Sequence, residues 1–150
     1  MASFLLLACA PSDKVGIAER AQSEAGVQAR LTEWVRAVNN RSLDTLANLY
    51  LQSRDLLIVW PDGDRTLGWP EASSKWNTWA AGPAQLNYVA EHPAIDILDR
   101  HVALVTFRAS LSRLAAGRRT TVEGRVIQVW VGSPGDSRWR IRAEETASAP

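Results

Sequence analysis

The stretch VEGRVIQVWV at residues 122–131 decides the fold class. It is rich in β-branched residues and lacks proline, which is typical of a strand inside a sheet. Side chains of a strand alternate between its two faces. The even-numbered residues from Val126 to Trp130 therefore share one face, and the odd-numbered residues from Ile127 to Val131 share the other. We expect the even-numbered face to look inward and the odd-numbered face to lie outside the sheet.

Other strand-like runs accompany this one on both sides. The runs are at residues 56–60, 86–90, 94–98 and 102–111, with a last strand after the turn at 133–136. Three helices are expected before or between them: one from about residue 13 to 39, a second capped by Ser42, and a third opened by Gly68 with Pro70 in its first turn. This order predicts an α+β fold, an antiparallel sheet with helices packed on one face.

Length, charge and residue usage limit the kinds of function to expect. The chain has 150 residues, which suits one domain, and 17 basic against 16 acidic side chains. Since neither sign dominates, we expect no nucleic-acid partner. One cysteine and two histidines are too few for a disulfide framework or a cysteine-based zinc site, so we expect neither a metal nor a cofactor.

The N-terminal segment leaves the cellular location open. Leu6-Leu7-Ala8-Cys9 resembles a bacterial lipobox, but no Lys or Arg precedes the short apolar run. Residues 1–11 are expected to be a signal or lipobox remnant, or else a disordered leader, ahead of a single domain at 12–150. The protein is accordingly expected in the cytoplasm, or at the bacterial cell envelope if Cys9 is lipidated, which is also the condition for a membrane partner.

Four short patterns resemble the NTF2-like superfamily, in its SnoaL-like and ketosteroid-isomerase-like branch, over residues 20–148. They are the segments 42–50 (SLDTLANLY), 68–71 (GWPE), 123–130 (EGRVIQVW) and 138–146 (RWRIRAEET). The resemblance implies a cone-shaped α+β barrel, a curved and mainly antiparallel sheet wrapped round a long N-terminal helix. It also implies a pocket inside the cone and a homodimer formed through the outer sheet face, which includes Ile127, Val129 and Val131.

The resemblance does not carry over the best-known chemistry of the branch. Trp34 stands where ketosteroid isomerases have a tyrosine of the oxyanion hole. Trp60, just before Pro61, replaces the aspartate that acts as general base, and Gln128 replaces the protonated aspartate. Because no base remains at the required place, isomerase chemistry of that kind is not expected.

The expected catalytic pair is Glu145 with Gln128. Alternation along the last strand predicts that Glu145 shares a face with Trp139, Ile141 and Ala143. If that face looks into the cone, burial raises the pKa of Glu145 and makes it a usable acid or base. The alternative is that Glu145 lies beyond the covered part of the strand, paired with an arginine in solvent.

The rest of the expected pocket lining is mostly aromatic or aliphatic. The lining residues are Trp34, Val38, Tyr50, Ile58, Trp60, Leu86, Tyr88, Val105, Phe107, Val126, Trp130 and Ala143. Such a wall suits a small, flat hydrophobic molecule, with acid/base chemistry of isomerase, hydrolase or dehydratase type. Two alternatives remain open: tryptophans fill the cone, or the domain is a non-catalytic ligand carrier or dimeric interaction module.

Overall fold

The computed structural model describes residues 15–82, 85–135 and 138–148. The helices are α1 (Ile17–Asn40), α2 (Leu43–Leu49) and α3 (Trp69–Ala80). The strands are β1 (Leu57–Val59), β2 (Arg65–Leu67), β3 (Gln85–Asp99), β4 (Val102–Ala115), β5 (Arg118–Val131) and β6 (Arg140–Ser148). The lipobox-like segment and the rest of residues 1–14 lie outside the described part of the chain.

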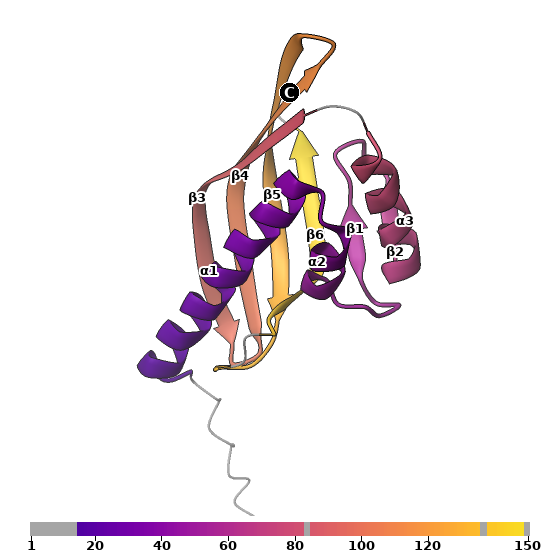
Figure 1. Ribbon diagram of the computed structural model, residues 1–150. Helices are drawn as coiled ribbons and strands as arrows, with labels where there is room; N and C mark the ends of the chain where they lie inside the picture. Colours follow the sequence, from indigo (N-terminus) through magenta and orange to yellow (C-terminus); the bar gives the residue numbers. More distant parts are fainter. Residues whose placement is uncertain (1–14, 83–84, 136–137, 149–150) are drawn as a thin grey trace, which may run out of the picture.

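The six strands form one sheet in the order β2-β1-β6-β5-β4-β3. All neighbouring pairs are antiparallel except β1 and β6, which run parallel. Figure 1 shows α1 lying across the inner face of β3 to β6, while the long hairpin of β4 and β5 projects beyond it. The predicted fold, a curved and mainly antiparallel sheet round a long N-terminal helix, is confirmed.

Helix α1 owes its position to one apolar stripe. Val27, Leu31, Trp34 and Val38 follow the spacing of three and four residues that puts side chains on one helix face, and all four are buried. The helix ends at Asn40 and is capped by Arg41, whose φ of 54° is left-handed. The helix was expected to begin at about residue 13, but α1 begins at Ile17.

Strand β3 replaces the two strands predicted at residues 86–90 and 94–98. Its pairing with β4 shifts by one residue between Glu91 and Ala94, which marks a β-bulge. His92 lies in this bulge with a φ of 50°, followed by Pro93, which has no N–H to give to a ladder. A bulge absorbs both residues without ending the strand, which explains why the prediction placed a break here.

A second bulge corrects the predicted inner face of β6. Trp130 pairs with Ile141, but the preceding Val129 pairs with Ala143, so Arg142 is an extra residue in β6. One extra residue inverts the alternation of every side chain beyond it. Glu144 is consequently the inward residue, 5% exposed, whereas Glu145 is exposed to solvent. The expectation that Glu145 shares a face with Ile141 was wrong for this reason.

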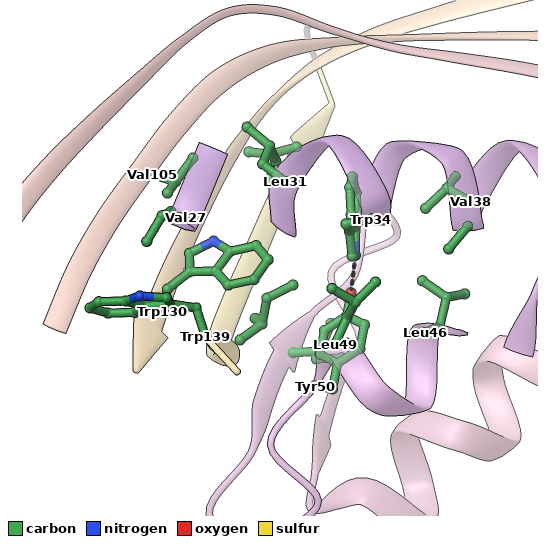
Figure 2. Packing of buried hydrophobic residues seen from close by; sticks show 14 of the residues in the cluster. Val27, Leu31, Trp34, Val38, Leu46, Leu49, Tyr50, Val105, Trp130 and Trp139 are labelled. Atoms are coloured by element: carbon green, nitrogen blue, oxygen red, sulfur yellow. Dashed lines mark hydrogen bonds between the residues drawn. The ribbon is translucent and has the colours of Figure 1, made fainter. Parts of the chain in front are cut away.

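Two tryptophans occupy the end of the core beside the N-terminal half of α1 (Figure 2). Figure 2 shows Trp130 and Trp139 lying together near Val27, with Trp34 further along the helix. Both of these tryptophans are fully buried, so they fill this end of the cone. A cavity is consequently expected only towards the other end of α1.

Candidate functional site

A cavity of about 320 Å³ opens at that other end, between α1, α3, the turn after β1 and the inner face of β4 and β6. Its lining residues are Trp34, Val38, Trp60, Pro61, Asp62, Lys75, Trp76, Trp79, Tyr88, Leu111, Arg113, Glu144 and Thr146. The volume falls at the lower end of the range for small-molecule sites in proteins, roughly 300–1,000 Å³. The wall is mostly aromatic, with a few polar groups at defined places.

The aromatic wall is held by edge-to-face contacts. The rings of Trp60 and Trp76 have centroids 5.3 Å apart at 67°, and those of Trp76 and Trp79 are 5.3 Å apart at 89°. Trp34 and Tyr88 pack in the same manner, 5.3 Å apart at 82°. Since each ring contacts another at a favourable angle, the rings hold one another in place and present an apolar surface to the cavity.

Glu144 is the buried carboxyl group of this cavity, and two donors hold it. The Tyr50 hydroxyl donates to Glu144 Oε2 at 2.9 Å, and Gln128 Nε2 donates to the same oxygen at 2.8 Å. Two indole groups orient these donors: Trp34 Nε1 donates to the Tyr50 hydroxyl at 2.9 Å, drawn as a dashed line in Figure 2, and Trp130 Nε1 donates to Gln128 Oε1 at 3.0 Å.

The network has only one consistent direction. An indole N–H can donate but not accept. Trp130 therefore requires Gln128 Oε1 as its acceptor, which turns the Gln128 amide nitrogen towards Glu144. Trp34 likewise occupies the Tyr50 oxygen and leaves the Tyr50 proton for Glu144. Both donors meet Oε2, so Oε1 of Glu144 has no hydrogen-bond partner among the described residues.

Burial controls the protonation of this group. It raises the pKa of Glu144 to about 7, against the lowering effect of the hydrogen bonds from Gln128 and Tyr50. Burial and the nearby Glu144 charge raise the pKa of Tyr50 and of Tyr88, so both phenols stay neutral. Near neutral pH, Glu144 is thus populated in both its acid and its base form, as a proton-transfer catalyst requires.

The rim of the cavity carries a charge cluster in which one lysine pairs with two aspartates. Lys75 Nζ lies 3.0 Å from Asp62 Oδ2 and 3.0 Å from Asp64 Oδ2, and 5.2 Å from the centre of the Trp60 ring. The Lys75 hydrogen bond lowers the pKa of Asp62. These contacts connect α3 to the turn after β1 and so fix the edge of the aromatic wall.

Four residues of the predicted lining do line the cavity: Trp34, Val38, Trp60 and Tyr88. Leu86 lies in a separate surface groove. The others lie outside both lining sets, in the core or behind the wall: Tyr50, Ile58, Val105, Phe107, Val126, Trp130 and Ala143. Gln128 reaches the carboxyl group through its hydrogen bond, as does Tyr50.

Several lining residues were missed by the prediction. Leu111 and Arg113 continue the inward alternation of Phe107 along β4, so strand parity would have found them. Trp76 and Trp79 of α3 were absent from the predicted lining, although both line the cavity. Glu144 could not be found, because its inward position depends on the bulge at Arg142.

The positions matched to ketosteroid isomerases have other roles here. The Trp34 N–H is used by Tyr50, and Trp60 Nε1 donates to Thr66 Oγ1 at 3.1 Å. Gln128 acts as a donor to Glu144 rather than to a ligand. The one buried carboxyl group of the described residues comes instead from the last strand.

Most of the sequence matches the model of a known protein family. The sequence model of the SnoaL-like domain matches residues 27–147, most of the chain. The chain belongs to the SnoaL-like domain family. The matched segment runs from the middle of α1 into β6 and so contains every cavity residue of this SnoaL-like protein. No curated protein matches it.

Solved structures share the fold of this SnoaL-like protein at low sequence identity. An NTF2-like superfamily protein from Salmonella enterica has a TM-score of 0.77 at 16% identity, covering 87% of this chain and 93% of that one. A candidate dehydratase of the NTF2-like family from Streptomyces avermitilis has 0.78 at 14%, covering 87% and 98%. A CaMKII hub from S. rosetta has 0.69 at 18%, covering 83% and 95%. These likenesses establish the NTF2-like fold.

The described residues contain neither a metal-ligand cluster nor a membrane-spanning helix. No group of three or more histidine, cysteine, aspartate or glutamate side chains there is arranged to hold a metal ion. Within the same ranges, no helix has both the length and the apolar character needed to cross a membrane.

Proposed function

We propose that this protein binds a small, mostly apolar molecule in the aromatic cavity and transfers a proton to or from it through Glu144. The observation that carries the proposal is the Glu144 carboxyl group, which lines the cavity and is 5% exposed, with Oε2 held by two donors and Oε1 without a hydrogen-bond partner among the described residues. A preorganised carboxyl group with a pKa near the working pH is an efficient acid or base.

The hydrogen bonds also define which atom reacts. Oε2 accepts from both Tyr50 and Gln128, so the acidic proton of neutral Glu144 resides on Oε1. In the ionised form, Oε1 is the oxygen that receives a proton from the ligand. In this proposal Oε1 both gives and receives the proton, while Oε2 stays bound to Tyr50 and Gln128.

This arrangement favours reactions that need one proton carrier. Glu144 takes a proton from a ligand carbon and returns it either to another carbon, which is an isomerisation, or to a leaving hydroxyl. In the second case a C–H and a C–O bond break, a C=C bond forms, and water leaves. A hydrolase reaction would instead use ionised Oε1 to deprotonate water. The Tyr88 hydroxyl, which lines the cavity without a hydrogen-bond partner among the described residues, is suited to bind a ligand oxygen.

The chain offers a matched control for testing this proposal. Glu144→Gln keeps the shape and removes the titrating proton, whereas Glu145→Gln makes the same change on the exposed neighbour. A library of apolar carbonyl and hydroxyl compounds is screened by thermal shift and by quenching of the cavity tryptophans. Binding compounds are then incubated with each protein, and products are measured by mass spectrometry.

The expected result is turnover by wild type and Glu145→Gln, and a loss of about 100-fold or more in Glu144→Gln, with ligand binding retained. Turnover that is unchanged in Glu144→Gln contradicts the catalytic role. Ligands that bind without any turnover in wild type leave only the binding half of the proposal.

A second candidate function, a dimeric interaction domain, rests on the outer sheet face. Ile127 is 45% exposed there, next to the half-buried Val129 and Val131. The likeness to a hub domain supports looking for assembly. Sedimentation is expected to give a dimer that Ile127→Arg dissociates and that Val122→Arg, an equally exposed site on the opposite face, leaves intact. A wild-type monomer at micromolar concentration contradicts this candidate.

A further inference from the structure

We infer that the ligand of the cavity carries an anionic group, such as a carboxylate, which Arg113 binds at the mouth while the apolar part of the ligand extends towards Glu144. This inference rests on the proposed function of the same cavity and narrows its ligand class. Arg113 differs from Lys75, the other basic residue of the lining, because it has no ion-pair partner among the described residues.

The other charged groups of the lining already have partners within the protein. Lys75 is bound to Asp62 and Asp64 at 3.0 Å each. Glu144 is held by neutral donors and is protonated over part of the neutral range. Arg113 lines the cavity but forms no ion pair with any described residue. It is therefore the cation of the lining that is available to a ligand.

The strand register places Arg113 on the inner face of the sheet. Phe107, Leu111 and Arg113 are alternate residues of β4, and Phe107 is buried in the core. The register partners of Arg113 are Leu86 on β3 and Thr120 on β5, neither of which carries a charge. Because no carboxylate faces it from either strand, its guanidinium group is free to bind a carboxylate with two parallel hydrogen bonds.

A surface groove adjoins the mouth on the hairpin of β4 and β5. Arg119 lies on the adjoining groove, whose lining also includes Arg113 and the neutral side chains of Asn87 and Ser112. Arg119 pairs with Leu114, so it lies on the opposite face of the hairpin from Arg113, and the anion is therefore bound by Arg113 alone.

Glu144 and Arg113 lie at opposite ends of the cavity, and the distance between them favours an elongated ligand. Glu144 pairs with Gln128, and Gln128 pairs with Val105 of β4. Arg113 is eight residues further along the same strand, about 26 Å of a straight strand at 3.3 Å per residue. The bend of β3 to β5 seen in Figure 1 shortens the direct path, but the two groups still belong to opposite ends. An elongated molecule with its anion at one end satisfies both.

A pair of probes that differ only in charge tests the inference. Biphenyl-4-carboxylate and its neutral counterpart, biphenyl-4-methanol, are titrated into the full chain while tryptophan fluorescence is followed. The variants are Arg113→Met, which keeps the aliphatic stem, and the control Arg125→Met, an exposed arginine whose register partner is Arg108 on the outer face.

We expect wild type to bind the carboxylate about 10-fold more tightly than the alcohol. Arg113→Met loses that preference and binds the alcohol as wild type does, whereas Arg125→Met retains it. The preference also decreases as salt is raised from 20 to 300 mM, because an exposed ion pair is screened. Equal affinity of wild type for both probes, failure to bind the carboxylate, or equal weakening of both probes in Arg113→Met overturns the inference.

These outcomes are separate from those of the catalytic proposal. Arg113 takes no part in proton transfer, so turnover tests with Glu144→Gln remain valid on neutral ligands whatever Arg113 does. Conversely, an anion preference that depends on Arg113 stands even if Glu144→Gln leaves turnover unchanged.

Discussion

Tyr50 and Glu144 are 94 residues apart in the chain, yet the Tyr50 hydroxyl donates to Glu144 Oε2 at 2.9 Å inside the core. The contact joins the end of α2 to the last strand. The bond matters for both packing and chemistry, because it orients the buried Tyr50 side chain and partly offsets the rise in the pKa of Glu144 that burial causes. Two predictions follow from this contact, and two more follow from other sites of close packing.

The first prediction concerns the pH dependence of stability. The folded pKa of Glu144, about 7, is above its usual value of 4.5, so the folded state keeps a proton that the unfolded state has lost. The contribution of this group is therefore fully present below about pH 4.5 and is lost as pH rises to 7, on the order of 3 kcal/mol. Urea unfolding of wild type and Glu144→Gln from pH 4.5 to 8 measures the difference.

The free energy of unfolding of wild type, relative to Glu144→Gln, is expected to fall across this interval and to level off above it. Glu145→Gln serves as the control, because it makes the same change in a solvent-exposed side chain. A constant difference between wild type and Glu144→Gln would mean that Glu144 does not titrate near pH 7.

The second prediction concerns Tyr50→Phe. The variant leaves the buried Trp34 N–H without its acceptor and removes one of the two donors to Glu144. We expect a loss of about 1–3 kcal/mol in the free energy of unfolding and a further rise in the pKa of Glu144. Chemical denaturation and carbonyl NMR of labelled glutamate measure the two effects. Tyr88→Phe, which removes a hydroxyl without a hydrogen-bond partner among the described residues, should change stability by less than about 0.5 kcal/mol.

The third prediction concerns Gly132, which lies over the ring of Trp139. A Cβ at this position would meet Trp139 ring atoms at 2.5 and 2.8 Å. Because Trp139 is fully buried and cannot withdraw, Gly132→Ala should lower stability by about 1–3 kcal/mol. At Gly16 a Cβ meets nothing within 4 Å, so Gly16→Ala should cost less than about 1 kcal/mol. Similar melting temperatures for both variants would contradict this packing.

The fourth prediction concerns Asn39, which closes the edge of the sheet. Its Nδ2 donates to the Tyr88 carbonyl at 2.9 Å, and its Oδ1 accepts from the Tyr88 N–H at 2.6 Å. Asn39→Ala removes both bonds between α1 and edge strand β3 and should cost about 1–2 kcal/mol. Hydrogen exchange at the Tyr88 amide should accelerate, while the exposed neighbour Asn40→Ala leaves it unchanged. Unaltered exchange in Asn39→Ala would show that the edge is protected by other contacts.

The fold was predictable because its signals are local and regular. The stripe of Val27, Leu31, Trp34 and Val38 has helical spacing, and the alternation of Val126 and Gln128 has the period of a strand. Each signal depends only on which residues are apolar. The order of elements then restricts the topology to a few choices.

The site was harder to predict because it depends on two irregularities. Neither bulge has a unique sequence signature: Arg142 looks like any residue of an alternating strand, and His92-Pro93 looks like a break. An error of one residue at Arg142 exchanges Glu144 for its neighbour Glu145, and with it a buried acid for a solvated one. Because Glu144 and Glu145 have the same side chain, only the backbone register decides which of them is buried.

The position of β6 has a consequence for synthesis on the ribosome. This strand is the last in the described chain, yet it lies between β1 and β5 and is the only connection of β1 and β2 to the rest of the sheet. Until it emerges from the exit tunnel, the nascent chain holds two separate pieces of sheet with exposed edges. Emergence of β6 therefore joins the two pieces of sheet, and the carboxyl group of Glu144 arrives in that same step.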